Sequence, residues 1–217
     1  RAIGILMGLS TTLSPFTTRP SYMEVTKLPL NEKLAALKDP GRRERILAEE
    51  TGPGFARLFN LMNGGQKVWL MTDPPNYEPD PADSLAAKAQ QAGQDAWSYI
   101  YDLMTSGDGK TIFYTPFANY AEGNLDCCRE MILDENTVMG LGDGGAHVGT
   151  ISDASFITTL ITHWGRDRTR GDRIDLPTLV KNQTRDTARA VELTDRGTLE
   201  PGMRADINVI DLSRLDV

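Results

Sequence analysis

The chain has 217 residues, a formal net charge of −7 and 40% hydrophobic residues, which is a composition typical of globular proteins. Its acidic balance, with 30 Asp and Glu against 23 Lys and Arg, argues against a nucleic-acid partner. No run of about 18 apolar residues occurs, so the sequence excludes a membrane-spanning helix. The only cysteines, Cys127 and Cys128, are adjacent, which excludes a disulfide framework and makes a cytoplasmic location the expectation.

The first residues enter directly into an apolar run. Residues 2–9 are almost wholly apolar and predict a strand that is covered on both faces. The sequence begins with neither a methionine nor a signal peptide. Because a domain seldom begins inside a core strand, we expect the chain to be part of a longer protein.

A long irregular region follows this strand. Residues 10–28 are rich in Ser, Thr and Pro and predict a loop, and residues 30–50 have a helical pattern that Pro40 interrupts. Within the proline-rich residues 51–81, only 67–71 resemble a strand. We therefore interpret residues 10–81 as a long insert, which in a compact fold often covers a functional site.

Helices and strands alternate over the rest of the chain. Asp83 is the expected cap of a helix over residues 84–91 that ends at Gly93, and a second helix is predicted over 95–104. Residues 111–115 then predict a strand, and residues 125–133 a helix.

The same alternation continues to the end of the chain. Residues 137–141 and 205–212 predict strands, and amphipathic patterns predict helices beginning near Phe156 and Leu176. Strands that alternate with helices favour an α/β fold with a parallel sheet. We therefore expect the strands at 2–8, 111–115 and 137–141 to be parallel.

The residues best suited to chemistry lie in the loop GLGDGGAHVG, from Gly140 to Gly149, directly after a predicted strand. In one interpretation this loop is only a glycine-rich connection, in which Asp143 accepts hydrogen bonds from turn amides and His147 lies at the surface. In a second, it binds a dinucleotide, since Gly140, Gly142 and Gly145 satisfy the G-x-G-x-x-G pattern. However, no helix opens directly after the pattern, and a carboxylate is unfavourable beside a pyrophosphate.

In the third interpretation the loop carries a reacting carboxylate. The catalytic groups of (β/α)₈ barrels lie at the C-terminal ends of the strands, where Asp143 would be placed. A carboxylate in this position can hold a metal ion and transfer protons, while Gly144 and Gly145 let the backbone approach a ligand closely.

Three other features are candidates for function. The Arg-rich run from Trp164 to Arg173 is interpreted as a solvated, self-paired loop, or alternatively as a grip on a substrate carboxylate. His163 lies in an apolar helical stripe and is interpreted as structural. Cys127 and Cys128 are interpreted as packing residues, because adjacent cysteines lack the spacing of metal ligands.

Several segments carry a family resemblance: IGILMGLSTTLSPFTTRPSY, PPNYEP, YTPFANYAEGNLD, GLGDGGAHVGTISDASF, THWGRDRTRG and LTDRGTLEPGMRADINVIDL. In this order they resemble the N-acyl-D-amino-acid deacylase branch of the amidohydrolase superfamily over nearly the whole chain. The DGGAH loop and the PGMRAD tail are the most specific parts, although the tail occurs in many amidohydrolases.

The resemblance implies the C-terminal part of a metal-dependent (β/α)₈ barrel over residues 1–195, and a segment of a small β-domain over residues 196–217. It implies one or two zinc ions, held by an HxH pair, a bridging side chain, two further histidines and an aspartate that Asp143 matches. Gly142 stands where relatives commonly have Ser. The other ligands have no counterpart here, so we expect them in a missing N-terminal part of the same enzyme.

The implied reaction is deacylation of a small-molecule N-acyl-D-amino acid. A metal-bound water attacks the amide carbonyl, and Asp143 accepts a proton and delivers it to the departing amine. Gly144, Gly145 and His147 are the expected substrate-binding residues. Two alternatives stay open: a non-catalytic amidohydrolase remnant or subunit, and the dinucleotide-binding module.

Overall fold

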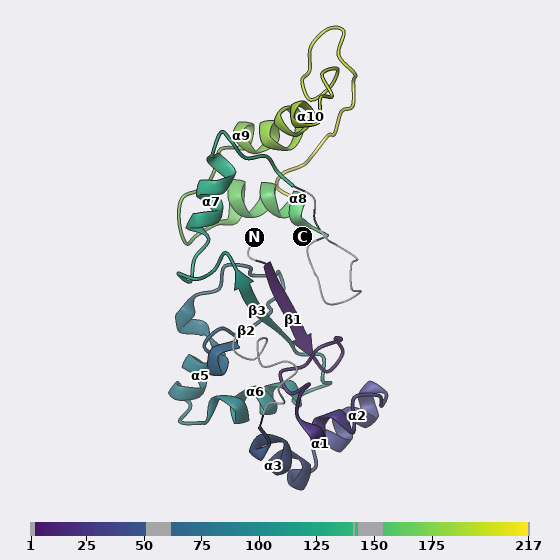
Figure 1. The fold of residues 1–217 in the computed structure, drawn as a ribbon, viewed down its shortest axis with the longest axis vertical. Helices are drawn as coiled ribbons and strands as arrows, with labels where there is room; N and C mark the ends of the chain where they lie inside the picture. The colour runs from purple at the N-terminus through teal and green to yellow at the C-terminus, as the bar shows by residue number, and fades with distance from the viewer. Residues whose placement is uncertain (1–2, 51–61, 141, 143–153, 217) are drawn as a thin grey trace. The chain divides into compact units, whose positions relative to one another are not determined.

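The computed structural model describes residues 3–50, 62–140, 142 and 154–216. The chain divides into two compact units (Figure 1), which meet in the sequence between Gly123 and Asn124. We call the described residues up to Gly123 the N-terminal unit and those from Asn124 onward the C-terminal unit. None of the described helices combines the length and the hydropathy needed to cross a membrane.

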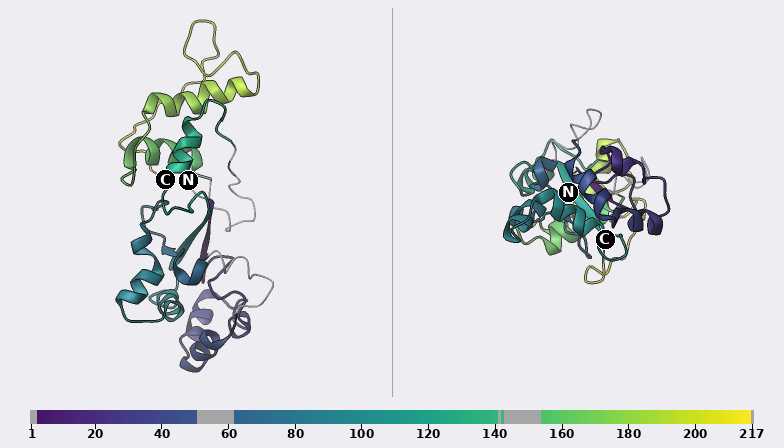
Figure 2. Two further views of the ribbon diagram at one scale, coloured as in Figure 1. Left: turned by 60° about the vertical axis from the view of Figure 1, so that its left-hand side comes forward. Right: turned by 90° about the horizontal axis from the view of Figure 1, so that it is seen from below.

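The N-terminal unit contains a three-stranded sheet with the strand order β1-β3-β2. β1 (Ile3–Gly8) and β3 (Ile112–Ala118) run side by side in opposite directions (Figures 1 and 2). The short β2 (Trp69–Leu70) also pairs antiparallel with β3, with Trp69 opposite Tyr114. The strands predicted at 2–8 and 111–115 are thus confirmed, and of the strand predicted at 67–71 two residues are found.

The expected parallel arrangement of these strands is wrong. Gly8, the last residue of β1, lies opposite Ile112, the first residue of β3, so the connecting helices return the chain to the end of the sheet where β1 stops. The glycines of β1 fit this neighbour closely. A Cβ at Gly4 would lie 2.2 Å from the ring of Tyr114, and one at Gly8 would lie 2.6 Å from the carbonyl oxygen of Thr111.

The helices of this unit largely follow the predicted pattern. They are α1 (Pro20–Met23), α2 (Leu30–Leu37), α3 (Pro40–Ala48), α5 (Leu85–Gln91) and α6 (Ala96–Met104), with short 3₁₀ turns at Asn63–Gly65 and Pro81–Asp83. The break at Pro40 and the left-handed Gly93 (φ 65°) are confirmed. The expected cap Asp83 is corrected to Ser84, whose hydroxyl accepts from the amide of Ala87 at 3.4 Å. Asp83 instead ends the preceding turn.

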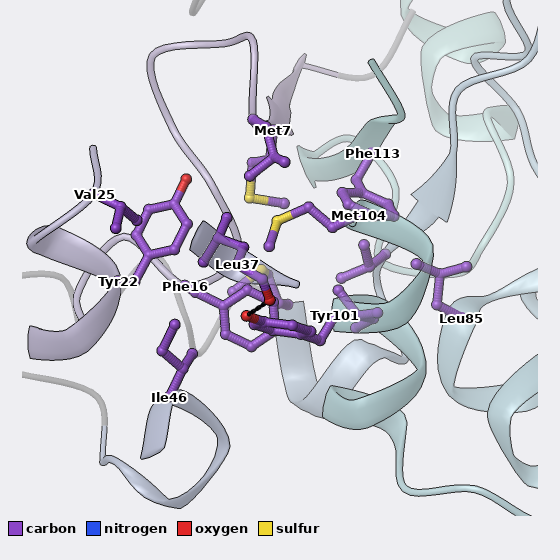
Figure 3. Close-up of a cluster of buried hydrophobic side chains, with 14 residues drawn as sticks. Met7, Phe16, Tyr22, Val25, Leu37, Ile46, Leu85, Tyr101, Met104 and Phe113 are labelled. Carbon is purple, nitrogen blue, oxygen red and sulfur yellow. Dashed lines mark hydrogen bonds between the residues drawn. The ribbon is translucent and has the colours of Figure 1, made fainter. Parts of the chain in front are cut away.

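The core of the N-terminal unit lies between β1, β3 and the helices (Figure 3). Aromatic rings pack edge-on within it, with 5.3 Å between the ring centroids of Phe16 and Tyr101. The hydroxyl of Tyr101 donates to the carbonyl of Leu37 at 2.8 Å. The buried members are Met7, Leu9, Phe16, Tyr22, Val25, Leu37, Ile46, Met62, Val68, Leu85, Ile100, Tyr101, Met104 and Phe113.

The C-terminal unit is helical in its described part. Its elements are α7 (Asp126–Leu133), α8 (Phe156–Thr159), the π-helix η4 (Leu160–Asp167), α9 (Leu176–Lys181), the π-helix η5 (Asn182–Asp186) and α10 (Thr187–Ala190). α8 continues directly into η4, and α9 packs against η4. The helices expected near Phe156 and Leu176 are therefore present.

The strand predicted at 137–141 is wrong over its described residues 137–140, which have irregular backbone. Thr137 continues the turn that ends α7, because its amide donates to Asp134 at 3.2 Å and its hydroxyl donates to Met131. An apolar pattern by itself does not make a strand, because the backbone N–H and C=O groups of a strand need hydrogen-bond partners on a neighbouring strand. The described part of the C-terminal unit contains no strand.

The strand predicted at 205–212 is also wrong, because these residues are irregular. Ile207 and Val209, inside this segment, are 63% and 97% exposed. Arg204, the residue before the segment, donates its amide to the carbonyl of Asp195 at 2.7 Å, and the carbonyl of Leu212, at the end of the segment, accepts from Arg166. The assignment of residues 196–217 to a small β-domain stays a prediction.

Candidate functional site

The four residues predicted for the site, Asp143, Gly144, Gly145 and His147, lie outside the described residues. The structure does describe the elements that precede and follow them. α7 and the turn after it lead to Gly140, and α8 begins at Phe156 on the other side. What the structure describes of this region is therefore the two flanking elements.

The turn after α7 is held by local side-chain hydrogen bonds. The carboxylate of Asp134 accepts from the amide of Asn136 at 2.7 Å, and Thr137 bonds back to the last turn of the helix. Short polar side chains of this kind favour turns because they replace the hydrogen bonds that a helix would make. This arrangement directs the chain away from α7 toward Gly140.

After the loop in the sequence, α8 and η4 bury one face within the C-terminal unit. Leu160, Ile161 and Trp164 are buried, and Trp164 is fully inaccessible to solvent. His163 is half-buried and packs edge-on against Trp164, with 5.1 Å between the ring centroids. This packing supports the interpretation of His163 as a structural residue.

The guanidinium group of Arg168, directly after η4, is fully buried. It donates to the carboxylate of Asp126 at 2.6 Å and to the carbonyl of Asp172 at 2.9 Å. It also lies over the ring of Trp164, 4.8 Å from the centroid. A buried charge needs such partners, because its desolvation is costly.

This burial corrects the interpretation of the Arg-rich run as a solvated loop. Arg166 does pair with its neighbour Asp167, at 2.6 Å, and this hydrogen bond lowers the pKa of the Asp167 carboxyl. However, Arg166 also donates to the carbonyls of Leu212 and Leu215, which ties the end of the chain to η4. Arg166 and Arg168 thus bind groups of the protein itself rather than presenting a free grip for a substrate carboxylate.

A cavity of about 380 Å³ opens between α7, residues 137–139 and η4. Its lining is mostly apolar, and its volume is in the range of small-ligand sites. The lining residues are Cys128, Met131, Ile132, Thr137, Val138, Met139, Phe156, Leu160, Trp164 and Asn182.

The two cysteines differ in environment. Cys128 is buried and lines this cavity, as expected of a packing residue, whereas Cys127 is exposed, contrary to the prediction. Among the described residues, no three His, Cys, Asp or Glu side chains lie close enough to hold a metal ion. The described part of the chain therefore does not by itself supply a metal site.

Sequence reasoning missed the role of Arg168. The four-residue spacing between Trp164 in η4 and Arg168 directly after it is a signal that could have indicated stacking of the guanidinium on the indole ring. The structure also gives a reason for Gly171, since a Cβ there would lie 2.7 Å from the guanidinium carbon of Arg168. No local pattern indicated Asp126 as the partner, because the pair joins residues 42 positions apart.

Comparison with known protein families shows to which family the chain belongs. Residues 94–217, which include α6, β3, the GLGDGGAHVG loop and the whole C-terminal unit, match the amidohydrolase family. The chain belongs to the amidohydrolase family. Searches of curated proteins and of solved structures found no significant match.

Membership makes this chain part of a family of metal-dependent hydrolases. Amidohydrolases generally use metal ions, but the described residues show no group of ligands for one. The mixed α/β class is confirmed. The eight-stranded barrel stays a prediction, since the strands described here form a three-stranded antiparallel sheet.

Proposed function

We propose that this amidohydrolase cleaves the amide bond of N-acyl-D-amino acids and that Asp143 transfers the proton in this reaction. The single observation that carries the proposal is the family match, which covers the GLGDGGAHVG loop. The motifs that resemble the N-acyl-D-amino-acid deacylase branch support the substrate class.

The proposed chemistry assigns two proton transfers to Asp143. Its ionised carboxylate accepts a proton from the water that attacks the amide carbonyl, and then delivers this proton to the departing amine. The products are a carboxylate and a D-amino acid. Gly144 and Gly145 let the backbone approach the substrate, and His147 donates a hydrogen bond to it.

For the metal, we propose zinc with Asp143 as this chain's ligand. The described residues do not complete a ligand set for the ion. When bound, zinc would supply Lewis-acid chemistry at the carbonyl and the water. We propose that the other ligands belong to an N-terminal part of the same enzyme.

The proposal extends to the organisation of the complete enzyme. Residues 1–195 belong to its catalytic domain, with the insert at 10–81 covering the site, and residues 196–217 belong to a small β-domain. A barrel of eight strands in the complete enzyme rests on the family match alone.

The test is the substitution Asp143→Asn in the complete enzyme. The amide keeps the size of the side chain but can neither accept the proton nor carry the charge, so turnover of N-acyl-D-amino acids is expected to fall by about 10²–10⁴-fold. Hydrolysis is measured by release of the free amine from N-acyl-D- and N-acyl-L-amino acids, with zinc added.

Asp134→Asn is the matched control, because Asp134 is exposed and its role in the turn needs only an acceptor oxygen, which Asn retains. This variant is expected to keep wild-type turnover. Near-wild-type turnover by Asp143→Asn would remove Asp143 from the mechanism. A wild-type enzyme that hydrolyses neither enantiomer would exclude the substrate class.

A further inference from the structure

Another cavity, of about 370 Å³, opens within the N-terminal unit. It is bounded by residues 63–69, which include β2, by the turn that begins at Pro81, and by residues 120–123, which follow β3. Its volume is in the range of small-ligand sites. None of the residues proposed for catalysis lines it.

Two aromatic side chains form a wall of this cavity. Trp69 and Tyr120 are 4% and 5% exposed and pack edge-on, with 6.0 Å between their ring centroids. The indole N–H of Trp69 donates to the carbonyl of Asp80 at 2.7 Å, and the hydroxyl of Tyr120 donates to the carbonyl of Pro79. Because these polar groups already have partners in the protein, the wall offers a ligand mainly apolar surface.

The backbone on two sides of the cavity adopts the left-handed region. The φ angle is 44° at Asn63 and 70° at Gly123. A Cβ at Gly123 would lie 2.6 Å from the ring of Pro81, so these two lining residues pack closely. A residue other than glycine keeps a positive φ only where the surrounding structure fixes it. The edges of the cavity are therefore held in one conformation.

The rim carries one cation and one anion. Lys67 precedes β2 and Glu122 follows β3, and both side chains are exposed at the cavity. Within the part of the chain that the structure describes, neither side chain has a hydrogen-bond or ion-pair partner, and the two do not pair with each other. A ligand with a single charge would be attracted by one of these groups and repelled by the other. A ligand that carries both charges satisfies both groups.

We propose that this cavity binds a free amino acid with an apolar side chain. Lys67 binds its carboxylate, Glu122 binds its ammonium group, and its side chain lies against Trp69 and Tyr120. An α-amino acid carries both charges on one carbon atom, whereas in a peptide the length of the chain separates them. Binding uses no residue of the GLGDGGAHVG loop, so the inference does not rest on the proposed hydrolysis.

The test follows the NMR signal of Trp69 in the complete enzyme labelled with fluorinated tryptophan. This signal is assigned by its loss in Trp69→Phe. Leucine, titrated into the millimolar range as each enantiomer, is expected to shift it until it saturates. Isocaproate, which is leucine without the ammonium group, and isoamylamine, which is leucine without the carboxylate, are each expected to bind about tenfold more weakly. Each of them lacks one charge-assisted hydrogen bond.

Two substitutions test the rim residues directly. Lys67→Gln and Glu122→Gln each remove one charge, and each is expected to weaken leucine binding about tenfold. Lys27→Gln and Glu44→Gln are the matched controls, because these side chains are exposed and do not line the cavity. Both controls are expected to keep the wild-type affinity.

Three results would overturn the inference. They are a Trp69 signal that neither enantiomer of leucine shifts, an affinity for leucine that is the same in Lys67→Gln as in wild type, and binding of isocaproate as tight as that of leucine. A saturable, Lys67-dependent shift in an enzyme that hydrolyses no N-acyl-amino acid would support the amino-acid site and would contradict the proposed function alone.

Discussion

Tyr101 connects two helices of the N-terminal unit through one hydroxyl group. It lies on α6, is buried, and donates to the carbonyl of Leu37 at the end of α2. Burial raises its pKa from 10.0 to about 12. The folded protein therefore retains this proton at pH values where the unfolded chain has lost it. The contribution of Tyr101 to stability is complete below pH 10 and is lost as the pH rises toward 12.

The substitution Tyr101→Phe tests this dependence. The variant is expected to lose about 1 kcal/mol at pH 8, because the buried carbonyl of Leu37 loses its donor. It is also expected to show a smaller fall in the urea midpoint between pH 9 and pH 12 than wild type. Tyr99→Phe, on the same helix, is the control and should retain the wild-type slope. A slope unchanged by Tyr101→Phe would contradict the assignment.

Among single residues, the burial of a charged side chain was the feature that the sequence predicted least well. Arg168 lies among other Arg and Asp residues that favour a solvated loop, and the sequence shows neither its burial nor its distance to Asp126. Desolvation of a charge depends on what the whole unit packs around it. The local pattern therefore identified the Arg-rich run, but it did not indicate that the guanidinium of Arg168 is buried.

At the scale of elements, the antiparallel pairing of β1 and β3 requires a residue without a side chain at Gly8. A Cβ there would meet the carbonyl oxygen of Thr111 at 2.6 Å, which is closer than backbone atoms allow. Gly41 in α3 is the opposite case, since the nearest atom to its Cβ position is a side-chain oxygen of Asp39 at 3.5 Å. Both are glycines at ordinary φ, so their substitution by alanine gives a matched comparison.

Gly8→Ala is expected to destabilise the protein by about 1–3 kcal/mol, as overpacking against a fixed backbone does. Gly41→Ala is expected to stabilise it by about 0.4–1 kcal/mol, because alanine restricts the unfolded chain and favours helix. Urea unfolding followed by tryptophan fluorescence measures both. Equal stability of Gly8→Ala and wild type would argue against the observed pairing with β3.

Helices were predicted better than strands for a physical reason. The hydrogen bonds of α6 close within the helix, and its cap is local, since the carboxylate of Asp95 accepts from the amide of Ser98 at 2.9 Å. A strand depends on a partner elsewhere in the chain. The alternation at 205–212 is a real pattern of the sequence, yet none of the described strands pairs with it. The direction of β3 against β1 likewise depends on the path of the chain over about 100 residues.

At the scale of the whole molecule, the family was predictable because long motifs carry it, whereas the site could be predicted only as a loop. Asp143, Gly144, Gly145 and His147 follow from the composition of that loop and from the family resemblance. The metal ligands expected from the resemblance could not be found in this chain, since it contains only two histidines, His147 and His163. In the proposed enzyme the centre is assembled from distant segments, and such a centre leaves no local signal in one of them.

The 217-residue chain alone is therefore expected to bind zinc weakly and to hydrolyse no N-acyl-amino acid. A structural zinc site binds with about 10–16 kcal/mol and uses four ligands, and the described residues offer no group of three. Isothermal titration with zinc, run in parallel on the Asp143→Asn variant as a baseline, measures this. A stoichiometric nanomolar site, or turnover by this chain, would contradict a centre that other segments complete.

The π-helix η4 has a consequence for how related chains should be aligned. In it the amide of Arg168 donates to the carbonyl of His163, five residues earlier, at 2.8 Å. A π-helical stretch holds more residues per turn than an α-helix. A one-residue deletion between Leu160 and Asp167 would tighten it toward α-helix while the residues after it keep nearly the same face, because the deletion removes the extra residue of the π-helical turn. A one-residue gap at this place in a homologue would therefore leave Arg168 on the face that meets Asp126.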